Sequence, residues 1–253
     1  MKMTMGMAVS IPSVKNLSGY FSSPEDNLRH PGLILIHEVW GLGDHIKDVA
    51  NRFAEEGYAV LAPDLLSETG IIEKVDQKIL EEIRNPITRD EAQKKLRAAM
   101  APIISPDFAK STVGKLKACV DYMLENKKVN DKIAVIGFCF GGTYAYALAA
   151  EDNRIQAAVP FYGHAPEPID RIKNISCPIL AFYGEQDHNL VDSLPDLESK
   201  MKEHGKNFTY KIYPNTGHAF FNDTNLSTYN KDAATDAWRR TILFLKQGHF
   251  TTL

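Results

Sequence analysis

The sequence predicts an α/β protein with a mostly parallel central sheet and helices on both faces of that sheet. Short apolar runs, of the kind found in strands buried on both faces, recur along the chain. Each run is followed by a segment whose apolar residues repeat at helical spacing, which is typical of a parallel sheet. The 253 residues, 44% of them hydrophobic, suffice for one large domain or two small ones.

The elements follow in order along the chain. The apolar run 32–39 (GLILIHEV) predicts the first buried strand, and 44–57 predicts a helix that Asp44 can cap and Gly57 ends. Residues 58–62 form the next strand, closed by Pro63 and Asp64. Further strands are expected at 133–138, 155–162, 178–184 and 208–213, and further helices at 108–126, 140–150, 194–204 and 231–245.

The segment 65–107 is less regular than the rest of the chain. Within it Ile72, Val75, Ile79 and Ile83 repeat at helical spacing and stop before Pro86. This apolar stripe predicts a packed helix inside an insertion between two strands of the sheet.

Charge and composition exclude several functional classes. The net charge of −3 argues against nucleic-acid binding, and no apolar run approaches the roughly 20 residues of a membrane span. The start MKMTMGMAVSIPSVK is interpreted as a mature N-terminus, not a signal peptide. Three cysteines without close spacing predict neither a disulfide framework nor a zinc site, and a reducing cytoplasm is expected. Without an HExxH motif, a Cys-x-x-Cys pair or a phosphate-binding glycine loop, no metal and no cofactor is expected.

A candidate nucleophile lies where the strand 133–138 meets the helix 140–150. Gly137-Phe138-Cys139-Phe140-Gly141 fits the G-x-nucleophile-x-G elbow. Side chains two positions before and after the nucleophile would collide in so sharp a turn, which explains the glycines. At a helix N-terminus the helix dipole and the free N–H groups favour a thiolate. The alternative is a tight glycine-rich turn that holds an inert, buried cysteine.

An elbow nucleophile needs a base, and the base needs an orienting carboxylate. Asp187 follows the strand 178–184, and His218 lies in the loop after the strand 208–213. The carboxyl ends of parallel strands meet at one edge of the sheet. Taken singly, Asp187 could be a helix cap and His218 a surface residue. The chain order nucleophile, acid, histidine indicates a triad.

The chain resembles the dienelactone hydrolase family (carboxymethylenebutenolidases), a cysteine branch of the α/β-hydrolases. The resemblance extends over about 33–245, and its motifs are His37-Glu38-Val39-Trp40-Gly41-Leu42, Ala62-Pro63-Asp64-Leu65, the elbow with Gly142, Tyr183-Gly184-Glu185-Gln186-Asp187 and Gly217-His218-Ala219-Phe220. It implies one α/β-hydrolase domain over 1–253, with 65–107 as a helical, cap-like insertion over the site. It also implies a Cys139-His218-Asp187 triad that hydrolyses a lactone or an ester.

Glu38 ends the first buried strand beside the expected elbow. A carboxylate there is costly unless it is satisfied, and next to a thiol it would accept the S–H proton or raise the thiol pKa. The resemblance implies that Glu38 holds the resting thiol and takes its proton when substrate arrives. The alternative is a structural hydrogen bond to loop N–H groups. The elbow places the N–H of Phe140 in the oxyanion hole, and the resemblance adds that of Val39.

The expected substrate departs from that of the family. Well-known members clamp an anionic dienelactone with two arginines, whose positions correspond here to Glu68 and Asn222. A neutral ester or lactone, or another small acyl compound, therefore fits better. Arg84, Arg89 and Arg97 could reach the site from the insertion or be solvated helix residues, and Trp40, Tyr144 and Phe221 could line an apolar pocket or belong to the core.

Two other functions remain open. One is a general esterase or thioesterase acting on a neutral substrate, and the other is a non-catalytic small-molecule-binding scaffold. A monomer or a small homo-oligomer is expected, with no membrane partner. Among the remaining candidates, His37 is expected to be a hydrogen-bonded core histidine, and Cys119 and Cys177 to be structural. His45 and His188 have no partner visible in the sequence.

Overall fold

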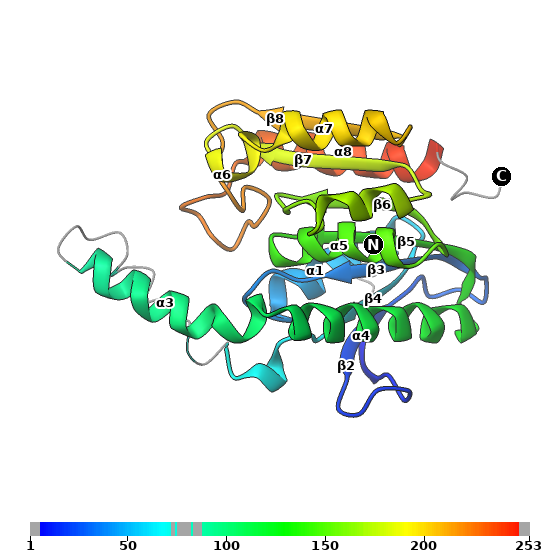
Figure 1. Cartoon of the computed structure of the whole chain (residues 1–253). Coiled ribbons are helices and arrows are strands. Elements are labelled where there is room, and N and C mark those ends of the chain that lie inside the picture. Colours follow the sequence, from blue (N-terminus) through cyan, green and yellow to red (C-terminus); the bar gives the residue numbers. More distant parts are fainter. Residues whose placement is uncertain (1–5, 72–73, 75–81, 83–87, 248–253) are drawn as a thin grey trace.

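A central sheet of eight strands organises the computed structural model, which describes residues 6–71, 74, 82 and 88–247 (Figure 1). The strand order is β1-β2-β4-β3-β5-β6-β7-β8. The strands are β1 (Met7–Ser10), β2 (Ser18–Ser22), β3 (His30–Ile36), β4 (Ala59–Pro63), β5 (Val129–Phe138), β6 (Ile155–Phe161), β7 (Ile179–Gly184) and β8 (Phe208–Tyr213).

The sheet is mostly parallel, as the sequence predicts. Neighbouring strands from β4 through β3 and β5 to β8 run parallel, and only β1 and β2 at one edge pair antiparallel. The six predicted strands are confirmed, whereas β1 and β2 were not predicted. No residue of β1 is buried and β2 is only partly buried, because an antiparallel edge can leave one face open to water, so neither reads as a long buried apolar run.

Helices cover both faces of the sheet. The helices of the described chain are α1 (Asp44–Glu55), α3 (Arg89–Ile104), α4 (Pro106–Glu125), α5 (Phe140–Glu151), α6 (His188–Val191), α7 (Leu194–Glu203) and α8 (Lys231–Gln247), with short 3-10 turns η1 (Ser67–Thr69) and η2 (Ile169–Asn174). On one face α1 packs against α8, with the rings of Phe53 and Trp238 4.4 Å apart. Helices α4 and α5 contact each other and the central strand β5 on the other face.

Two sequence predictions about element ends were wrong. The first buried strand ends at Ile36, so His37 and Glu38 belong to the loop that follows β3. Asp44 does not cap α1, because Gly43 occupies the N-cap position and Asp44 is the first helical residue. An acidic residue in the first turn still complements the positive end of the helix dipole.

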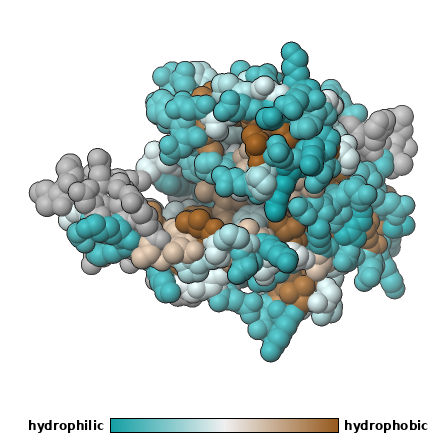
Figure 2. All heavy atoms as spheres, viewed as in Figure 1, coloured by the Kyte–Doolittle hydropathy of each residue, from teal (hydrophilic) through white to brown (hydrophobic). Residues whose placement is uncertain are grey.

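The segment 65–107 separates β4 from β5 and is more helical than its sequence indicates. It contains η1 and the 16-residue helix α3, which tolerates Pro102 in its last turn. The predicted stripe Ile72, Val75, Ile79 and Ile83 lies outside the described residues. In Figure 1 α3 projects from the body, and in Figure 2 the surface between this projection and the body is hollowed, with hydrophobic residues along part of it. Within the described residues, no helix is long and apolar enough to cross a membrane.

Candidate active site

Cys139 occupies a strained turn between β5 and α5. Its backbone has φ 56° and ψ −113°, in the left-handed half of φ that a residue with a side chain rarely adopts. Its N–H donates a hydrogen bond to the carbonyl oxygen of Phe161, 3.0 Å away, at the end of β6. The side chain is half-buried, so the thiol remains within reach of solvent. Strain at this position is typical of a nucleophile elbow.

The glycines around Cys139 are required by close backbone contacts. A Cβ atom on Gly137 would lie 1.9 Å from the carbonyl oxygen of Gly141, and one on Gly141 would lie 2.2 Å from that of Ile36. Real Cβ atoms do not approach backbone that closely, and backbone cannot move aside cheaply. The first turn of α5 therefore packs directly on the ends of β5 and β3. This contact brings the elbow beside the loop that carries Glu38.

His218 and Asp187 lie together at the same edge of the sheet. The Nδ1 of His218 hydrogen-bonds to Oδ2 of Asp187 in a short contact. Because an ionised carboxylate only accepts, Nδ1 carries the proton and Nε2 is left for another partner. His218 also lies near enough to the thiol of Cys139 for the two side chains to interact, and this interaction contributes to the raised pKa of the imidazole. The structure thus brings together all three residues of the predicted triad.

Close backbone packing fixes this pair. A Cβ atom on Gly184, the last residue of β7, would lie 2.4 Å from the carbonyl oxygen of Gly217, so the two loops touch there. The N–H of Gln186 donates to the Thr216 carbonyl oxygen at 2.9 Å, and the N–H of Asn215 donates to the Glu185 side chain at 2.9 Å. These bonds hold the Asp187 turn against the loop that leads into His218.

The environment of His218 favours its protonated form. Burial alone lowers the pKa of the imidazole, but the hydrogen bonds to Asp187 and Cys139 and their negative charges outweigh burial and raise the pKa to about 10. The side chain is 42% exposed, so it can still exchange protons with water or with a bound molecule. A protonated imidazole between a carboxylate and a thiol can give its proton to a leaving group and take one back later.

Glu38 is buried in the loop after β3, with 3% of its surface exposed. Its Oε2 accepts a hydrogen bond from Nδ2 of Asn222 at 2.7 Å, and its Oε1 accepts one from the hydroxyl of Tyr162 at 3.2 Å. Burial raises the pKa of the carboxyl, and the two bonds together with the charges of His45 and His218 oppose that rise. Glu38 is therefore a satisfied, buried carboxylate whose affinity for a proton is higher than usual.

Tyr162 belongs to the site, although the sequence analysis did not select it. It follows β6 directly, is 1% exposed and has φ 38°, a value rare for a tyrosine. Its ring centroid lies 5.0 Å from that of His218, and burial together with the charges of Glu38 and Cys139 raises its pKa well above the ordinary value. The rule that ligands gather just past strand ends could have found it, since it closes the run 155–162.

The end of β3 lies alongside the start of α5. The two predicted oxyanion-hole donors are Val39, in the loop after β3, and Phe140, the first residue of α5. The ring of His37 stacks on that of Phe140, with centroids 5.8 Å apart. His37 is buried; its Nδ1 donates to the Glu38 carbonyl oxygen at 2.6 Å and its Nε2 accepts from the Leu65 N–H at 3.1 Å. Burial lowers its pKa, so it is the neutral core histidine that was expected. Phe140 opens α5, so its N–H has no partner within the helix, and Val39 is half-buried in the adjoining loop.

The predicted substrate-binding residues have different surroundings. Trp40 is 38% exposed, whereas Phe221 is 3% exposed and packs on Phe138 with centroids 5.1 Å apart. Tyr144 is buried against Phe140, with centroids 4.6 Å apart. Glu68 pairs with Lys115 at 3.7 Å, which offsets its charge.

Not every predicted contact can be placed. The side chain of Asn222 donates a hydrogen bond to Glu38, and its predicted contact with substrate stays a prediction. Arg84 lies outside the described residues, and the side chains of Arg89 and Arg97 are likewise not described.

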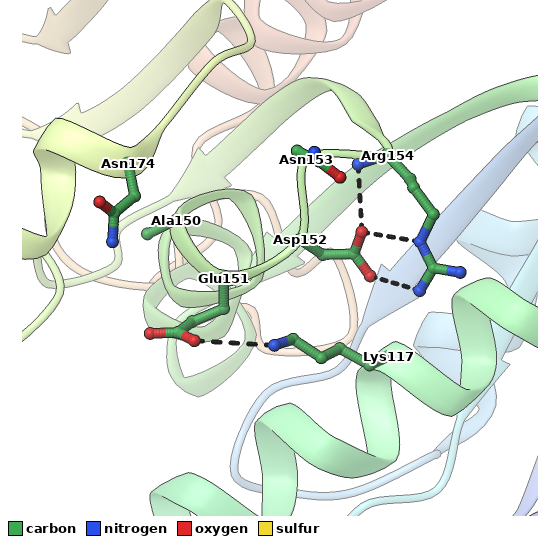
Figure 3. A pocket seen from close by; sticks show the side chains of 7 residues that line it. All are labelled: Lys117, Ala150, Glu151, Asp152, Asn153, Arg154 and Asn174. Carbon is green, nitrogen blue, oxygen red and sulfur yellow. Dashed lines mark hydrogen bonds and ion pairs between the residues drawn. The ribbon is translucent and has the colours of Figure 1, made fainter.

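A second cleft, of about 460 Å³, opens at the far end of α5 (Figure 3). Cys139 precedes the first residue of α5 and Glu151 is its last, so about 18 Å of helix separates the two sites. The charged groups of the cleft pair with one another: Lys117 with Glu151 at 3.6 Å, and Arg154 with Asp152 at 2.6 Å. This cleft therefore offers an ion-pair network and no candidate nucleophile. Among the described side chains, no cluster of His, Cys, Asp or Glu could hold a metal ion.

Known proteins resemble this chain over almost its whole length. The model of the Dienelactone hydrolase family matches residues 17–249. A Saccharolobus solfataricus protein named "Putative carboxymethylenebutenolidase" is 38% identical over 250 residues, which cover 91% of this chain and 94% of that protein. "Protein usf" of Aquifex pyrophilus is 31% identical over 239 residues, covering 90% and 92% of the two chains.

Solved structures share the fold. A crystal structure of a "Putative Dienelactone Hydrolase" from Klebsiella pneumoniae aligns with a TM-score of 0.78 at 23% identity, over 96% of this chain and 98% of that one. At such identity the likeness concerns the fold alone, and the eight-stranded, mostly parallel sheet agrees with it. The family match shows that the chain belongs to the dienelactone hydrolase family, and the shared fold is α/β-hydrolase-like.

Proposed function

We propose that this chain is a cysteine-dependent hydrolase of a lactone or carboxylic ester, with Cys139 as nucleophile, His218 as base and Asp187 as the residue that orients it. The observation that carries the proposal is the position of the His218 side chain, which hydrogen-bonds to Asp187 and interacts with Cys139 strongly enough to raise the pKa of the imidazole. The strained backbone of Cys139 supports the same role, since a merely structural cysteine gains nothing from a φ of 56°. Membership of a hydrolase family adds independent support.

The chemistry follows from these positions. The sulfur of Cys139 attacks the carbonyl carbon, and the electron pair of the C=O bond moves to oxygen. The N–H groups of Phe140 and Val39 stabilise that oxyanion, each contributing a few kcal/mol to the barrier reduction. When the C–O bond breaks, His218 gives its proton to the leaving oxygen. His218 then takes a proton from water, which hydrolyses the thioester and frees Cys139.

Glu38 acts before the attack in this proposal. It accepts the S–H proton when substrate enters, so that the thiol rests in its neutral, less oxidisable form between turnovers. A buried carboxyl with a raised pKa suits this role, since it holds a proton more readily than an exposed glutamate does. The alternative role, a structural hydrogen bond to loop N–H groups, lacks support, because the partners of its carboxylate are the side chains of Tyr162 and Asn222.

The substrate that suits these surroundings is a small, neutral ester or lactone. Glu68 is anionic and paired with Lys115, and Asn222 is bonded to Glu38, so neither offers a positive charge to a substrate carboxylate. Phe140, the residue after Cys139, packs its ring against those of Tyr144 and Phe108, and these rings would favour an apolar acyl group. Three free cysteines suit a reducing compartment, and we expect the protein in the cytoplasm.

The test is hydrolysis of an activated aryl acetate, an aryl thioacetate, an aryl hemisuccinate and a dienelactone by wild type and by Cys139→Ala. We expect the wild type to hydrolyse the neutral esters faster than the anionic hemisuccinate and Cys139→Ala to be inactive. Activity that survives Cys139→Ala would reject the mechanism. A strong preference for the thioacetate would indicate a thioesterase, and inactivity on every compound would favour the binding scaffold.

A further inference from the structure

Both ring nitrogens of the fully buried His37 are bonded to backbone groups of other residues. Its Nδ1 lies 2.6 Å from the carbonyl oxygen of Glu38, and the N–H of Leu65 donates to its Nε2 at 3.1 Å. A backbone N–H can only donate and a carbonyl oxygen can only accept, so Nε2 is free of a proton and Nδ1 carries one. The two contacts therefore fix His37 as a neutral Nδ1–H donor to Glu38.

The carbonyl that His37 binds belongs to the same peptide unit as a proposed oxyanion-hole donor. The peptide bond between Glu38 and Val39 joins the C=O of the first residue to the N–H of the second. In a trans peptide these two groups lie in one plane and point in opposite directions. A hydrogen bond that holds the C=O therefore sets the direction of the N–H. It also polarises the amide, which makes the N–H a stronger donor.

The Glu38 carbonyl oxygen is held from two sides. The N–H of Gly41 donates to it at 3.1 Å, from within the same loop, so both lone pairs of the oxygen are used. The bond from His37 differs, because the ring is itself anchored by Leu65 in the segment that follows β4. His37 thus ties the Glu38–Val39 peptide to a second part of the fold.

His37 also contacts the helix that carries the second proposed donor. Its ring stacks on that of Phe140 at an interplanar angle of 9°. A Cβ atom on Gly141 would lie 2.7 Å from the carbonyl oxygen of His37, so the first turn of α5 packs on the backbone of the same residue. One residue therefore holds both peptide segments whose N–H groups the mechanism needs.

We propose that His37 is a positioning residue for the oxyanion hole: its Nδ1–H orients and polarises the Glu38–Val39 peptide, and its ring packs against the start of α5. The inference rests on the proposed function, because it assigns a support to the N–H groups of that mechanism. When the sulfur of Cys139 attacks, the electron pair of the C=O bond moves to oxygen, and a preorganised N–H stabilises that charge. In this role His37 acts through the backbone and not on the substrate itself.

Two amide substitutions separate the two bonds of His37. Asparagine can place its Nδ2 where Nδ1 lies, so His37→Asn keeps the donor to Glu38 and loses the acceptor for Leu65. Glutamine can place its Oε1 where Nε2 lies, so His37→Gln keeps the bond from Leu65 and loses the donor to Glu38. For an aryl acetate we expect kcat near the wild-type value in His37→Asn and about tenfold lower in His37→Gln. KM should change little, because the oxyanion forms only in the transition state.

Two reagents show whether the loss concerns the oxyanion. In an aryl trifluoromethyl ketone the carbonyl carbon bonds to the sulfur of Cys139, the S–H proton passes to Glu38 and the C=O electron pair moves to oxygen. The inhibition constant should rise about tenfold in His37→Gln and stay unchanged in His37→Asn. Iodoacetamide alkylates the sulfur by displacing iodide and forms no oxyanion, so it should react with wild type and His37→Gln at equal rates.

Tyr146→Phe is the matched control. It removes a buried hydrogen bond of 2.8 Å to the hydroxyl of Tyr183, within the same helix α5. We expect this variant to lose stability in urea while kcat and the inhibition constant of the ketone stay at their wild-type values.

The outcomes separate the two proposals. Equal kcat in wild type and His37→Gln, with Cys139→Ala inactive, overturns the role of His37 and leaves the mechanism standing. Equal losses of kcat in both His37 variants, in step with their losses of unfolding free energy, indicate packing and also overturn the inference. Activity that survives Cys139→Ala would instead overturn the proposed function.

NMR of the wild type decides if neither His37 variant folds. A proton on Nδ1 of His37, and a downfield shift of the Val39 N–H signal when the ketone binds, are then expected. The absence of either signal change overturns the inference.

Discussion

Asn222 donates a hydrogen bond of 2.7 Å to Glu38, joining the loop that carries His218 to the loop that follows β3. The two residues are 184 positions apart in the chain and both are buried. By resemblance, Asn222 stands where other family members have a cationic residue. Here the amide of Asn222 satisfies the Glu38 carboxylate without bringing a charge of its own, and burial outweighs the groups that oppose it, so the pKa of the carboxyl rises.

Replacement of Glu38 by Gln should stabilise the fold at neutral pH while it impairs activity. The pKa of Glu38 is higher in the folded chain than in the unfolded one, so the folded chain keeps this proton to higher pH. Ionised Glu38 therefore costs stability, fully once the pH exceeds the folded pKa and not at all below the unfolded pKa. We expect Glu38→Gln to raise the free energy of unfolding by about 1 kcal/mol at pH 8 and not at pH 4.

Urea unfolding of both proteins at a series of pH values measures this difference. Glu68→Gln is the matched control. The Glu68 side chain is 46% exposed, so this substitution removes the same charge from the surface. A Glu38→Gln variant that is less stable than wild type at pH 8 would show that the carboxylate is a net stabilising group, contrary to the account.

Tyr162→Phe should shift the acid limb of the pH profile, the range in which kcat/KM rises with pH, to higher pH. The hydroxyl donates to Glu38 at 3.2 Å and lowers the pKa of that carboxyl, so its loss leaves Glu38 protonated over a wider range. A shift of about one pH unit is expected. Tyr213→Phe is the control, since its hydroxyl also donates to a carboxylate, that of Asp236 at 2.9 Å. Equal profiles for wild type and Tyr162→Phe would remove Tyr162 from the proton-accepting group.

Gly137→Ala should destabilise the chain severely, whereas Gly114→Ala should not. The added Cβ on Gly137 would overlap the Gly141 carbonyl oxygen at 1.9 Å, which demands movement of backbone at the elbow. The free energy of unfolding should fall by more than about 4 kcal/mol, a loss that is exceptional for one substitution. Gly114 lies within α4 with open space around it, so alanine there should stabilise by up to about 1 kcal/mol. Thermal unfolding of both variants checks the contrast, which a mild effect at Gly137 would contradict.

His218 should stabilise the fold below neutral pH and lose that effect in alkali. Although burial opposes it, the bonds to Asp187 and Cys139 raise the pKa from 6.5 to about 10. The stabilisation is therefore complete below about pH 6.5, the unfolded value, and disappears as the pH rises through about 10. Unfolding curves should separate wild type from His218→Gln at pH 6 and converge above pH 10. A gap that widens with pH would contradict the assignment, and exposed His188→Gln is the control.

The fold was predictable because it depends on local patterns, and so was the pairing of Asp187 with His218. A glycine-flanked cysteine between a strand and a helix, followed by Asp187 and His218 past later strands, needs no knowledge of long-range contacts. The parallel strands were visible as buried apolar runs. The edge strands β1 and β2 carried no such signal because they are short and mostly not buried, and α3 begins with charged residues and contains Pro102, which obscures its helical pattern.

The surroundings of Glu38 could not be predicted. Its bonds to Tyr162 and Asn222 span 124 and 184 residues, and no local spacing encodes which loops meet. The same holds for His45, for which the sequence offered no partner, and for Gln186, whose backbone fixes the Asp187 turn. Side chains whose role arises from a tertiary contact become recognisable only when the loops are in place.

Mass spectrometry of the enzyme quenched during turnover of an aryl acetate tests the central claim most directly. The account predicts one acetyl group on the peptide that contains Cys139, more of it in His218→Gln, where hydrolysis of the thioester is slowed, and none in Cys139→Ala. An acetyl group on another residue, or full turnover by Cys139→Ala, would contradict it.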